Sequence, residues 1–261
     1  MNPFMRHCRF VVMFLCWLAL CLSVGQRPAA AGDYPVQLYY AKMNFNYYHG
    51  SPCGFSVSGK ISVESLGGSE KVYVHYTYGD GEWVDVEAVY QGKAADGRSV
   101  WNFRTKDSAV PYSYYEYKCQ FAIRYEVNGK VYWDNNGGAD YSLYSSNMNK
   151  NGNTHWILGK SVLILDHASR WNNAYGDITG EIILKNLAYE KNVRVIYNTD
   201  NWQTVREAYA YYKEPMTDNL EKWAFTLPDT KSCNEVQFCL AYTVNGVTYW
   251  DNNFTLNYKC Y

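Results

Sequence analysis

The chain has 261 residues, enough for one large domain or two of ordinary size, and its 24 basic residues nearly balance 25 acidic ones. This balance, without a polybasic run, excludes nucleic acid and an anionic membrane as partners attracted by long-range charge. Aromatic residues make up 18% of the chain and 27 residues are tyrosine. Strands favour tyrosine, but a surplus this large also predicts aromatic recognition surfaces.

The first residues have the composition of a secretory leader. Arg6 and Arg9 precede an apolar run over residues 10–24, and small residues at 29–31 suit signal peptidase. We therefore expect residues 1–31 to be a signal peptide, which predicts a secreted, extracellular protein. A membrane anchor is the alternative, but the run is short for a spanning helix, so we expect no membrane partner after cleavage.

Five cysteines lie beyond this leader, in a compartment that permits disulfides. Cys53 is the partner available to Cys119 within the first half of the chain. In the second half, one pairing joins Cys233 to Cys260 and leaves Cys239 over, and other connectivities remain open. We expect disulfides, with the odd cysteine unpaired or bonded to another chain.

A ten-residue segment occurs twice, at residues 127–136 (VNGKVYWDNN) and at residues 244–253 (VNGVTYWDNN). In both copies Asn-Gly supplies the positive φ angles of a type I′ hairpin turn. Short β-branched and aromatic stretches alternate with Gly, Asn and Asp elsewhere, and no long segment has a helical period. The sequence therefore predicts an all-β protein made by duplication, with two β-sandwich modules in tandem.

The repeat also predicts where the modules begin and end. We expect a first module over residues 33–146, a linker over residues 147–154 and a second module over residues 155–261. The linker is polar and has few residues to bury. It is long enough for both modules to engage one polymer.

Alternation along the strand before each hairpin predicts core residues. Phe238, Leu240 and Tyr242 share one face in the second half, and Phe121 and Tyr125 do so in the first. Order along the repeat aligns other aromatic residues as well. These pairs are Trp202 with Trp83 and Tyr209 with Tyr90.

Four motifs of the second half occur in a recognisable order and spacing: residues 186–193 (NLAYEKNV), 197–202 (YNTDNW), 242–246 (YTVNG) and 249–253 (YWDNN). Together they resemble the family 21 carbohydrate-binding modules, the starch- and glycogen-binding domains of fungal glucoamylases and of glycogen-targeting subunits of protein phosphatase 1. The resemblance extends more loosely over residues 36–143. It implies two immunoglobulin-like β-sandwich modules with surface sites for α-1,4-linked glucans.

The implied carbohydrate-binding residues are aromatic platforms with polar neighbours. In the second module they are Trp202, Trp250, Asn252 and Asn253 at a first site, and Tyr189, Asn186, Lys191 and Tyr209 at a second site. In the first module they are Trp83, Trp133, Asn135 and Asn136. A glucose ring presents C–H bonds on its faces and hydroxyls at its rim. Aromatic rings flanked by amides and an ammonium group therefore suit it.

The first module departs from the family pattern. Gly68 stands where the tyrosine of the second site should be, so the resemblance implies this site for the second module and not for the first. A further aromatic residue of some family members is replaced by Ala122 and Cys239. We expect this replacement to weaken the first site in both modules.

A glycosidase would need two carboxylates placed across a cleft. Asp134 and Asp251 are the candidates, but each lies beside two asparagines in a turn, where a turn-stabilising role is favoured. The five histidines have no paired metal spacing, and no nucleophile elbow or phosphate loop is present. We therefore expect a non-catalytic binder of α-glucan polysaccharide, without metal or cofactor. The alternative is an extracellular matrix or cell-wall protein that uses its sandwiches for protein contacts, with decayed sugar sites.

The stretch over residues 194–197 (RVIY) is similar to the phosphatase-docking motif of glycogen-targeting subunits. It lies in a predicted strand and ends in tyrosine. We therefore do not expect it to dock a phosphatase.

Overall fold

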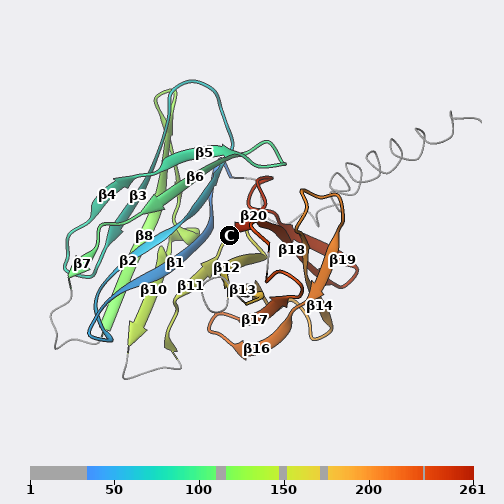
Figure 1. Cartoon of the computed structure of the whole chain (residues 1–261). Helices are drawn as coiled ribbons and strands as arrows, with labels where there is room; N and C mark the ends of the chain where they lie inside the picture. Colours follow the sequence, from blue (N-terminus) through green and yellow to red (C-terminus); the bar gives the residue numbers. More distant parts are fainter. Residues whose placement is uncertain (1–33, 110–115, 147–151, 171–175, 232) are drawn as a thin grey trace, which may run out of the picture. The chain divides into compact units, whose positions relative to one another are not determined.

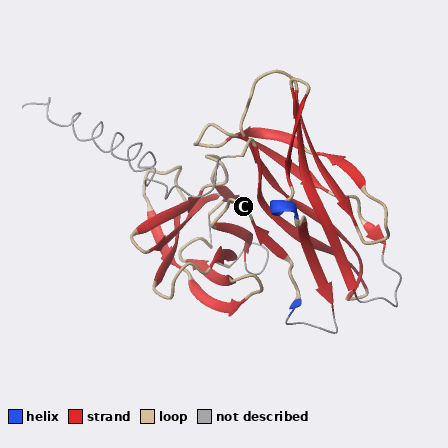
Figure 2. Ribbon diagram, turned by 180° about the vertical axis from the view of Figure 1, so that it is seen from behind, coloured by secondary structure: helices blue, strands red, loops and turns tan. Residues whose placement is uncertain are grey.

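The computed structural model describes residues 34–109, 116–146, 152–170, 176–231 and 233–261, and these are almost entirely strand and loop (Figure 2). The first part of the chain contains β1 (Val36–Tyr48), β2 (Ser51–Val63), β3 (Glu70–Thr77), β4 (Val84–Glu87), β5 (Val89–Lys93), β6 (Ser99–Arg104), β7 (Ser108–Ala109), β8 (Glu116–Val127), β9 (Lys130–Asp134), the short 3-10 helix η2 (Asn136–Gly138) and β10 (Tyr141–Ser146). The second part contains β11 (Trp156–Leu158), β12 (Leu163–Arg170), β13 (Ile178–Lys185), β14 (Lys191–Asn198), β15 (Arg206–Tyr209), β16 (Tyr211–Pro215), β17 (Leu220–Leu227), β18 (Val236–Val244), β19 (Val247–Asp251) and β20 (Tyr258–Cys260).

Within the described residues, these strands form four antiparallel sheets, two in each half (Figure 1). In the first half one sheet has the order β11-β1-β2-β6-β5 with β7 on β2, because β11, although it follows β10 in the chain, pairs with β1. The other sheet has the order β10-β8-β3-β4, with β9 on β8. The second half has β12-β13-β17-β16 and β15-β14-β18-β19, with β20 on β18. The prediction of an all-β fold with two β-sandwiches in tandem is confirmed.

The repeated hairpins have the predicted turns. The φ angles are 51° and 74° at Asn128 and Gly129, and 50° and 75° at Asn245 and Gly246. Two successive positive φ angles define the type I′ turn, whose twist matches that of the strands it joins. The turns therefore fix the registers of β8 with β9 and of β18 with β19.

Each sandwich has its own apolar core, and the predicted core residues are in it. Phe238, Leu240 and Tyr242 are fully buried in the second half, as are Phe121 and Tyr125 in the first. Strand alternation gives this result because successive side chains of a strand point to opposite faces of the sheet. The residues between them therefore lie on the outer faces.

The chain after β10 stays attached to the first half. Thr154 pairs with Tyr144, the His155 carbonyl accepts the amide of Met43, and β11 pairs with β1. Thr154 therefore bridges to the edge strand β10 of one sheet of the first sandwich, and β11 extends the other sheet, before the chain enters the second sandwich at β12. Residues 147–151 of the expected linker lie outside the described residues.

A third apolar cluster lies where the halves meet, within the single compact unit of residues 34–261. Trp156 and Leu158 of β11 pack against Ile164, Ile183 and Leu220 of the second half. Ion pairing adds to this contact, as in Lys42 with Asp166 at 3.7 Å. The two sandwiches are therefore joined by an apolar contact as well as by the chain.

Neither of the two expected disulfides is formed in the part of the chain that the structure describes. Cys53, Cys119, Cys233 and Cys260 are free thiols, so neither Cys53–Cys119 nor Cys233–Cys260 is formed. Cys119 is fully buried, and burial raises the pKa of its thiol to about 12. It packs as a small apolar residue in the first core.

Residues 1–31, the expected signal peptide, lie outside the described residues. Elsewhere, over the described residues, no helix has the length and apolar composition needed to cross a bilayer.

Candidate carbohydrate-binding surfaces

A row of cross-strand partners crosses the outer face of the β15-β14-β18-β19 sheet. Tyr209 pairs with Arg194, Arg194 with Ala241, and Ala241 with Trp250. Because Leu240 points into the core, this row points away from it. Tyr209 is 65% exposed and Trp250 is 47% exposed. The sheet therefore presents an aromatic side chain at each end of the row.

Trp202 lies on the loop between β14 and β15 and is anchored over the same face. Its indole N–H donates to Oε1 of Gln237 at 2.8 Å, and its backbone amide donates to Oδ1 of Asn198 at 2.8 Å. Gln237 precedes Ala241 by four residues on β18, about 14 Å along the strand. The structure therefore brings Trp202 and Trp250, the two predicted platforms of the first site, to one outer face.

Asn252 and Asn253 close the loop that follows Trp250. The side-chain oxygen of Asn252 accepts the amide of Thr255 at 2.9 Å, and the side-chain amide of Asn253 donates to the carbonyl of Asn257 at 3.2 Å. Lys60 of the first half donates to the side-chain oxygen of Asn253 at 3.2 Å. These two asparagines therefore hold the loop shape and make a contact between the halves.

Asn135 and Asn136 make the same bonds in the first half. The side-chain oxygen of Asn135 accepts the amide of Gly138 at 3.1 Å, and the side-chain amide of Asn136 donates to the carbonyl of Asp140 at 3.2 Å. The duplication has therefore kept the loop closure as well as the hairpin.

The two candidate acids of a glycosidase bind within their own halves. Asp251 accepts the hydroxyl of Tyr258 at 2.6 Å and the amide of Leu165 at 3.3 Å. Asp134 accepts the hydroxyl of Tyr141 at 2.9 Å and an amide of β1 at 2.7 Å. Burial raises the pKa of the Asp251 carboxyl, which these donors partly offset. Both aspartates therefore tie a hairpin end to the first strand of its sandwich.

The predicted second site is a loop that presents Tyr189, whose side chain is 98% exposed. Behind it, the Lys191 ammonium donates to Oδ1 of Asn186 at 2.6 Å and to Oε2 of Glu221 at 2.8 Å. The Lys191 side chain is only 4% exposed. Lys191 and Asn186 therefore brace the loop, and Tyr189 is its exposed aromatic residue.

The equivalent loop of the first half is closed. Gly68 has a φ of 90°, and a Cβ atom built on it would lie 2.2 Å from Oδ1 of Asn128. The side-chain amide of Asn128 donates to the carbonyl of Gly67 at 2.9 Å. This loop therefore lies against the β8–β9 turn, and a side chain in place of Gly68 would require a strained backbone and a shift of the Asn128 amide.

The first half carries a charged network between its two predicted tryptophans. Trp83 stacks on His75 with ring centroids 4.9 Å apart and an interplanar angle of 19°, and His75 also lies edge-on to Trp133 at 6.0 Å. Asp85 lies 2.7 Å from Nδ1 of His75 and accepts Arg124 at 2.8 Å. The structure thus brings Trp83 and Trp133 near each other, with the His75 ring in contact with both.

Arg124 and His75 were not among the residues predicted from the sequence. The Arg124 guanidinium lies 4.7 Å from the Tyr73 ring centroid and 5.9 Å from that of Trp133. In the second half the position of Arg124 is taken by Ala241. Both missed residues occupy outward positions next to core residues on their strands, and this alternation is the signal that could have identified them.

Strand register corrects one alignment made from order alone. Tyr209 pairs with β14, whereas Tyr90 of β5 pairs with Trp101 of β6 in the opposite sheet. The counterpart of Tyr90 is Tyr212, which pairs with Trp223. Tyr209 accordingly lies in the row of Trp250.

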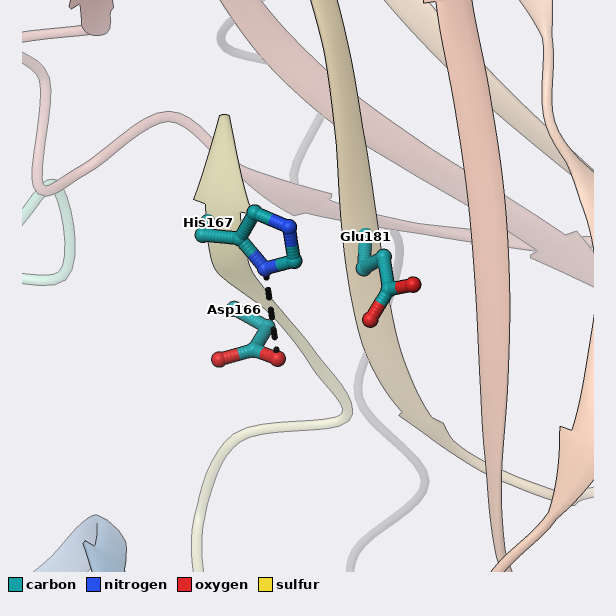
Figure 3. A group of neighbouring side chains, drawn as sticks. All are labelled: Asp166, His167 and Glu181. Carbon is teal, nitrogen blue, oxygen red and sulfur yellow. Dashed lines mark ion pairs between the residues drawn. The ribbon is translucent and has the colours of Figure 1, made fainter. Parts of the chain in front are cut away.

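Asp166, His167 and Glu181 form the group of possible metal ligands found among the described residues (Figure 3). Nδ1 of His167 lies 3.5 Å from Oδ2 of Asp166. Glu181 also pairs with Lys213 and Lys222. Burial raises the pKa of Glu181, but the bond from Lys213 and the charges of Lys213, Lys222 and His167 together lower it. Ammonium groups therefore already neutralise the carboxylates, which is the arrangement of a surface charge network.

These features define a protein with two β-sandwiches, exposed aromatic side chains on outer sheet faces and a braced aromatic loop. The family model for the carbohydrate/starch-binding module (family 21) matches residues 40–144 and 158–261. The chain belongs to this family, with two copies of the module.

Similar proteins include regulatory subunits and an enzyme. Protein phosphatase 1 regulatory subunit 3C of Bos taurus is 32% identical over 87 residues, which is 31% of this chain and 27% of that protein. Glucoamylase 1 of Rhizopus oryzae is 40% identical over 86 residues, which is 31% of this chain and 14% of the enzyme. The solved starch-binding domain of Rhizopus oryzae glucoamylase, in complex with beta-cyclodextrin and maltoheptaose, is 31% identical with a TM-score of 0.30. The match covers 38% of this chain and 91% of that domain. The chain therefore matches less than a third of the length of these two full-length relatives.

Proposed function

We propose that this protein is a secreted, non-catalytic binder of α-1,4-linked glucan, with its main surface on the second sandwich. The observation that carries the proposal is the outer face that presents Trp202 and Trp250 on one sheet. Aromatic rings bordered by amides suit a neutral sugar. The exposed Tyr189 adds a second platform in the same half.

The non-catalytic part of the proposal is supported by the roles of the carboxylates. Asp134 and Asp251 each accept a tyrosine hydroxyl and a backbone amide of their own half. A general acid and its partner must instead face a bound glycosidic bond from two sides. The similar proteins include regulatory subunits as well as a glucoamylase, so similarity to them does not by itself imply catalysis.

The stretch that resembles a phosphatase-docking motif is part of the fold. Residues 194–197 lie in β14, which pairs with β15 on one side and β18 on the other. Val195 and Tyr197 are in the second core. Docking through these side chains would require the central strand of the sheet to leave it, so we do not extend the proposal to phosphatase binding.

A sedimentation assay on granular starch tests the function. We expect the protein to leave the supernatant with starch and to remain in it with cellulose or chitin, whose glucan linkages or substituents differ. Binding to all three polysaccharides alike would indicate a surface without α-glucan specificity, and binding to none would refute the proposed function.

Secretion rests on the composition of residues 1–31 and is tested separately. We expect the full chain, made in a secretory host, to appear in the medium with a new N-terminus just beyond residue 31. Retention of the intact leader inside the cell would contradict this part of the proposal.

A further inference from the structure

A cavity of about 760 Å³ has walls from both halves of the chain. The first half contributes parts of β1, β11 and the segment 134–142, and the second half contributes residues near 185–187 and 218–220. This volume is within the range of small-ligand sites in proteins, roughly 300–1,000 Å³. A single family 21 module could not form such a cavity, because its walls come from two.

The charges on the cavity wall favour a neutral ligand. Its charged residues are Asp134, Asp140, Asp218, Lys160 and Lys185. Lys160 pairs with Asp96 at 3.0 Å, and Lys185 donates to the carbonyl of Gly159. Burial lowers the pKa of the Lys185 ammonium. An anion such as phosphate would therefore have to compete for cations that already have partners.

Aromatic and apolar side chains form part of the cavity wall. Trp156 and Tyr141 line it together with Leu38. Such a wall suits the C–H faces of a sugar ring, and the amide side chains of Asn136 and Asn219 lie on the same wall.

The cavity also borders both sets of predicted glucan-binding loops. Asn136 belongs to the loop after Trp133 in the first half. On the wall from the second half, the carbonyl of Asn219 accepts the backbone amide of Asn186 at 2.9 Å, and the side-chain amide of Asn219 donates to the carbonyl of Asn186 at 2.9 Å. Asn186 lies at the base of the loop that presents Tyr189. A chain of linked sugars in the cavity would therefore lie next to binding loops of both modules.

We propose that this cavity binds a short segment of α-glucan and so makes one polymer chain contact both modules. This inference rests on the proposed function. Two separate modules could not bind a ligand in this way, because the cavity has walls from both sandwiches. The ligand class is a neutral oligosaccharide, recognised by hydroxyl bonds to wall amides and by contact with wall aromatic rings.

Hydrogen exchange of the full chain with and without maltoheptaose locates the ligand. We expect maltoheptaose to protect backbone amides at 135–142 and 185–188 in addition to those near Trp202 and Trp250. Ser142, an exposed wall residue on the edge strand β10, gives a variant that fills the cavity, Ser142→Trp. We expect this variant to lose the cavity protection and to bind maltoheptaose about tenfold more weakly, a change of about 1.4 kcal/mol.

Lys118→Trp is the matched control, because Lys118 is exposed on the neighbouring strand β8 and is not part of the cavity wall. We expect it to bind as the unmodified protein does. Binding with protection confined to the outer face of the second sandwich would overturn the cavity inference and leave the proposed function intact. Failure of the unmodified protein to bind either maltoheptaose or starch would instead refute the function itself. The exchange measurement on the unmodified protein decides between these results even if Ser142→Trp does not fold.

Discussion

The outer faces of the two sandwiches carry tryptophans at equivalent positions but differ in what lies between them. Trp133 and Trp250 are nearly equally exposed, at 46% and 47%. In the first half, Arg124 contacts the ring of Trp133 and pairs with Asp85. In the second half the same position is Ala241. Ring exposure alone therefore does not distinguish the two tryptophans, whereas the guanidinium beside the Trp133 ring does.

Both faces carry an ion pair that a ligand would have to desolvate, Arg124 with Asp85 in the first half and Arg194 with Glu207 in the second. The faces differ at the tryptophan itself, because the Arg124 guanidinium lies 5.9 Å from the Trp133 ring centroid and interacts with ring electrons that would otherwise face a ligand. We infer that duplicated modules can keep their aromatic residues while one of them loses affinity for sugar.

The two halves also differ in the loop that carries the predicted second site. Tyr189 stands on a loop braced by Lys191, whereas the loop at Gly68 is closed against Asn128. In the first half Glu70 accepts the hydroxyl of Tyr125 at 2.9 Å near the start of β3. At this loop, therefore, the second half presents an exposed aromatic side chain and the first half does not.

Lys191→Met should have the largest effect, because it removes one partner of a buried ion pair. Glu221, whose side chain is 12% exposed, would be left without its cation. Breaking such a pair costs about 3–5 kcal/mol, which urea unfolding would measure. Lys213→Met, which removes an exposed partner of Glu181, should change the free energy of unfolding little. A loss of glucan binding with unchanged stability would show that Lys191 acts as a ligand and not as a brace.

Trp250→Ala should weaken maltoheptaose binding by about 1–3 kcal/mol, the scale of stacking on one exposed ring. The matched variant of the first half, Trp133→Ala, should have a smaller effect because Arg124 already occupies its surroundings. Calorimetric titration of both variants measures the difference. Equal losses would remove the distinction between the two faces, and unfolding of Trp250→Ala would identify Trp250 as a structural residue.

Tyr189→Ala should reduce binding by about tenfold at most, because one exposed ring is lost and the loop bonds behind it are untouched. Leu66, which is 38% exposed on the closed loop of the first half, provides the control Leu66→Ala. Surface plasmon resonance on immobilised glycogen would measure both. An equal effect of the two substitutions would mean that the second site is not confined to the second half.

His155 predicts a small pH effect at the junction of the halves. Burial, with a contribution from Lys222, lowers the pKa of His155 below its ordinary value of 6.5. The unfolded chain therefore takes up a proton first, so the free energy of unfolding should fall as pH drops below 6.5 and level off below the lowered pKa. His155→Gln should reduce this slope, because glutamine has no group that titrates in this pH range. A slope that persists in His155→Gln would assign the proton uptake to another group.

The fold could be predicted from the sequence because its signals are local. The Asn-Gly dipeptides fix the hairpin turns, and strand alternation identifies core residues such as Leu240. The pairing of β11 with β1 could not be predicted, since residues 156–158 gain their partners from a strand more than a hundred residues away. The polar composition indicated a linker, but tertiary contacts attach the end of this segment to the first sandwich.

The candidate site was predictable only where one residue determines the outcome. The sequence has Gly68 where the family pattern has tyrosine, and the structure adds that this loop lies against Asn128. The prediction of disulfides was wrong because the spacing of cysteines along the sequence does not give the distance between them in the fold. The network of His75 and Arg124 depends on the register of three strands, which order along the chain does not provide.

Sedimentation on granular starch with two sets of variants shows which half carries the main glucan-binding surface. One set combines Trp202→Ala, Trp250→Ala and Tyr189→Ala in the second half, and the other combines Trp83→Ala and Trp133→Ala in the first. Circular dichroism should first show that both sets retain the strand content of the unmodified protein. We predict that the second-half set stays in the supernatant while the first-half set still sediments with starch. Sedimentation of the second-half set together with loss of the first-half set would contradict the account, because it would place the glucan-binding surface on the face with the charged network.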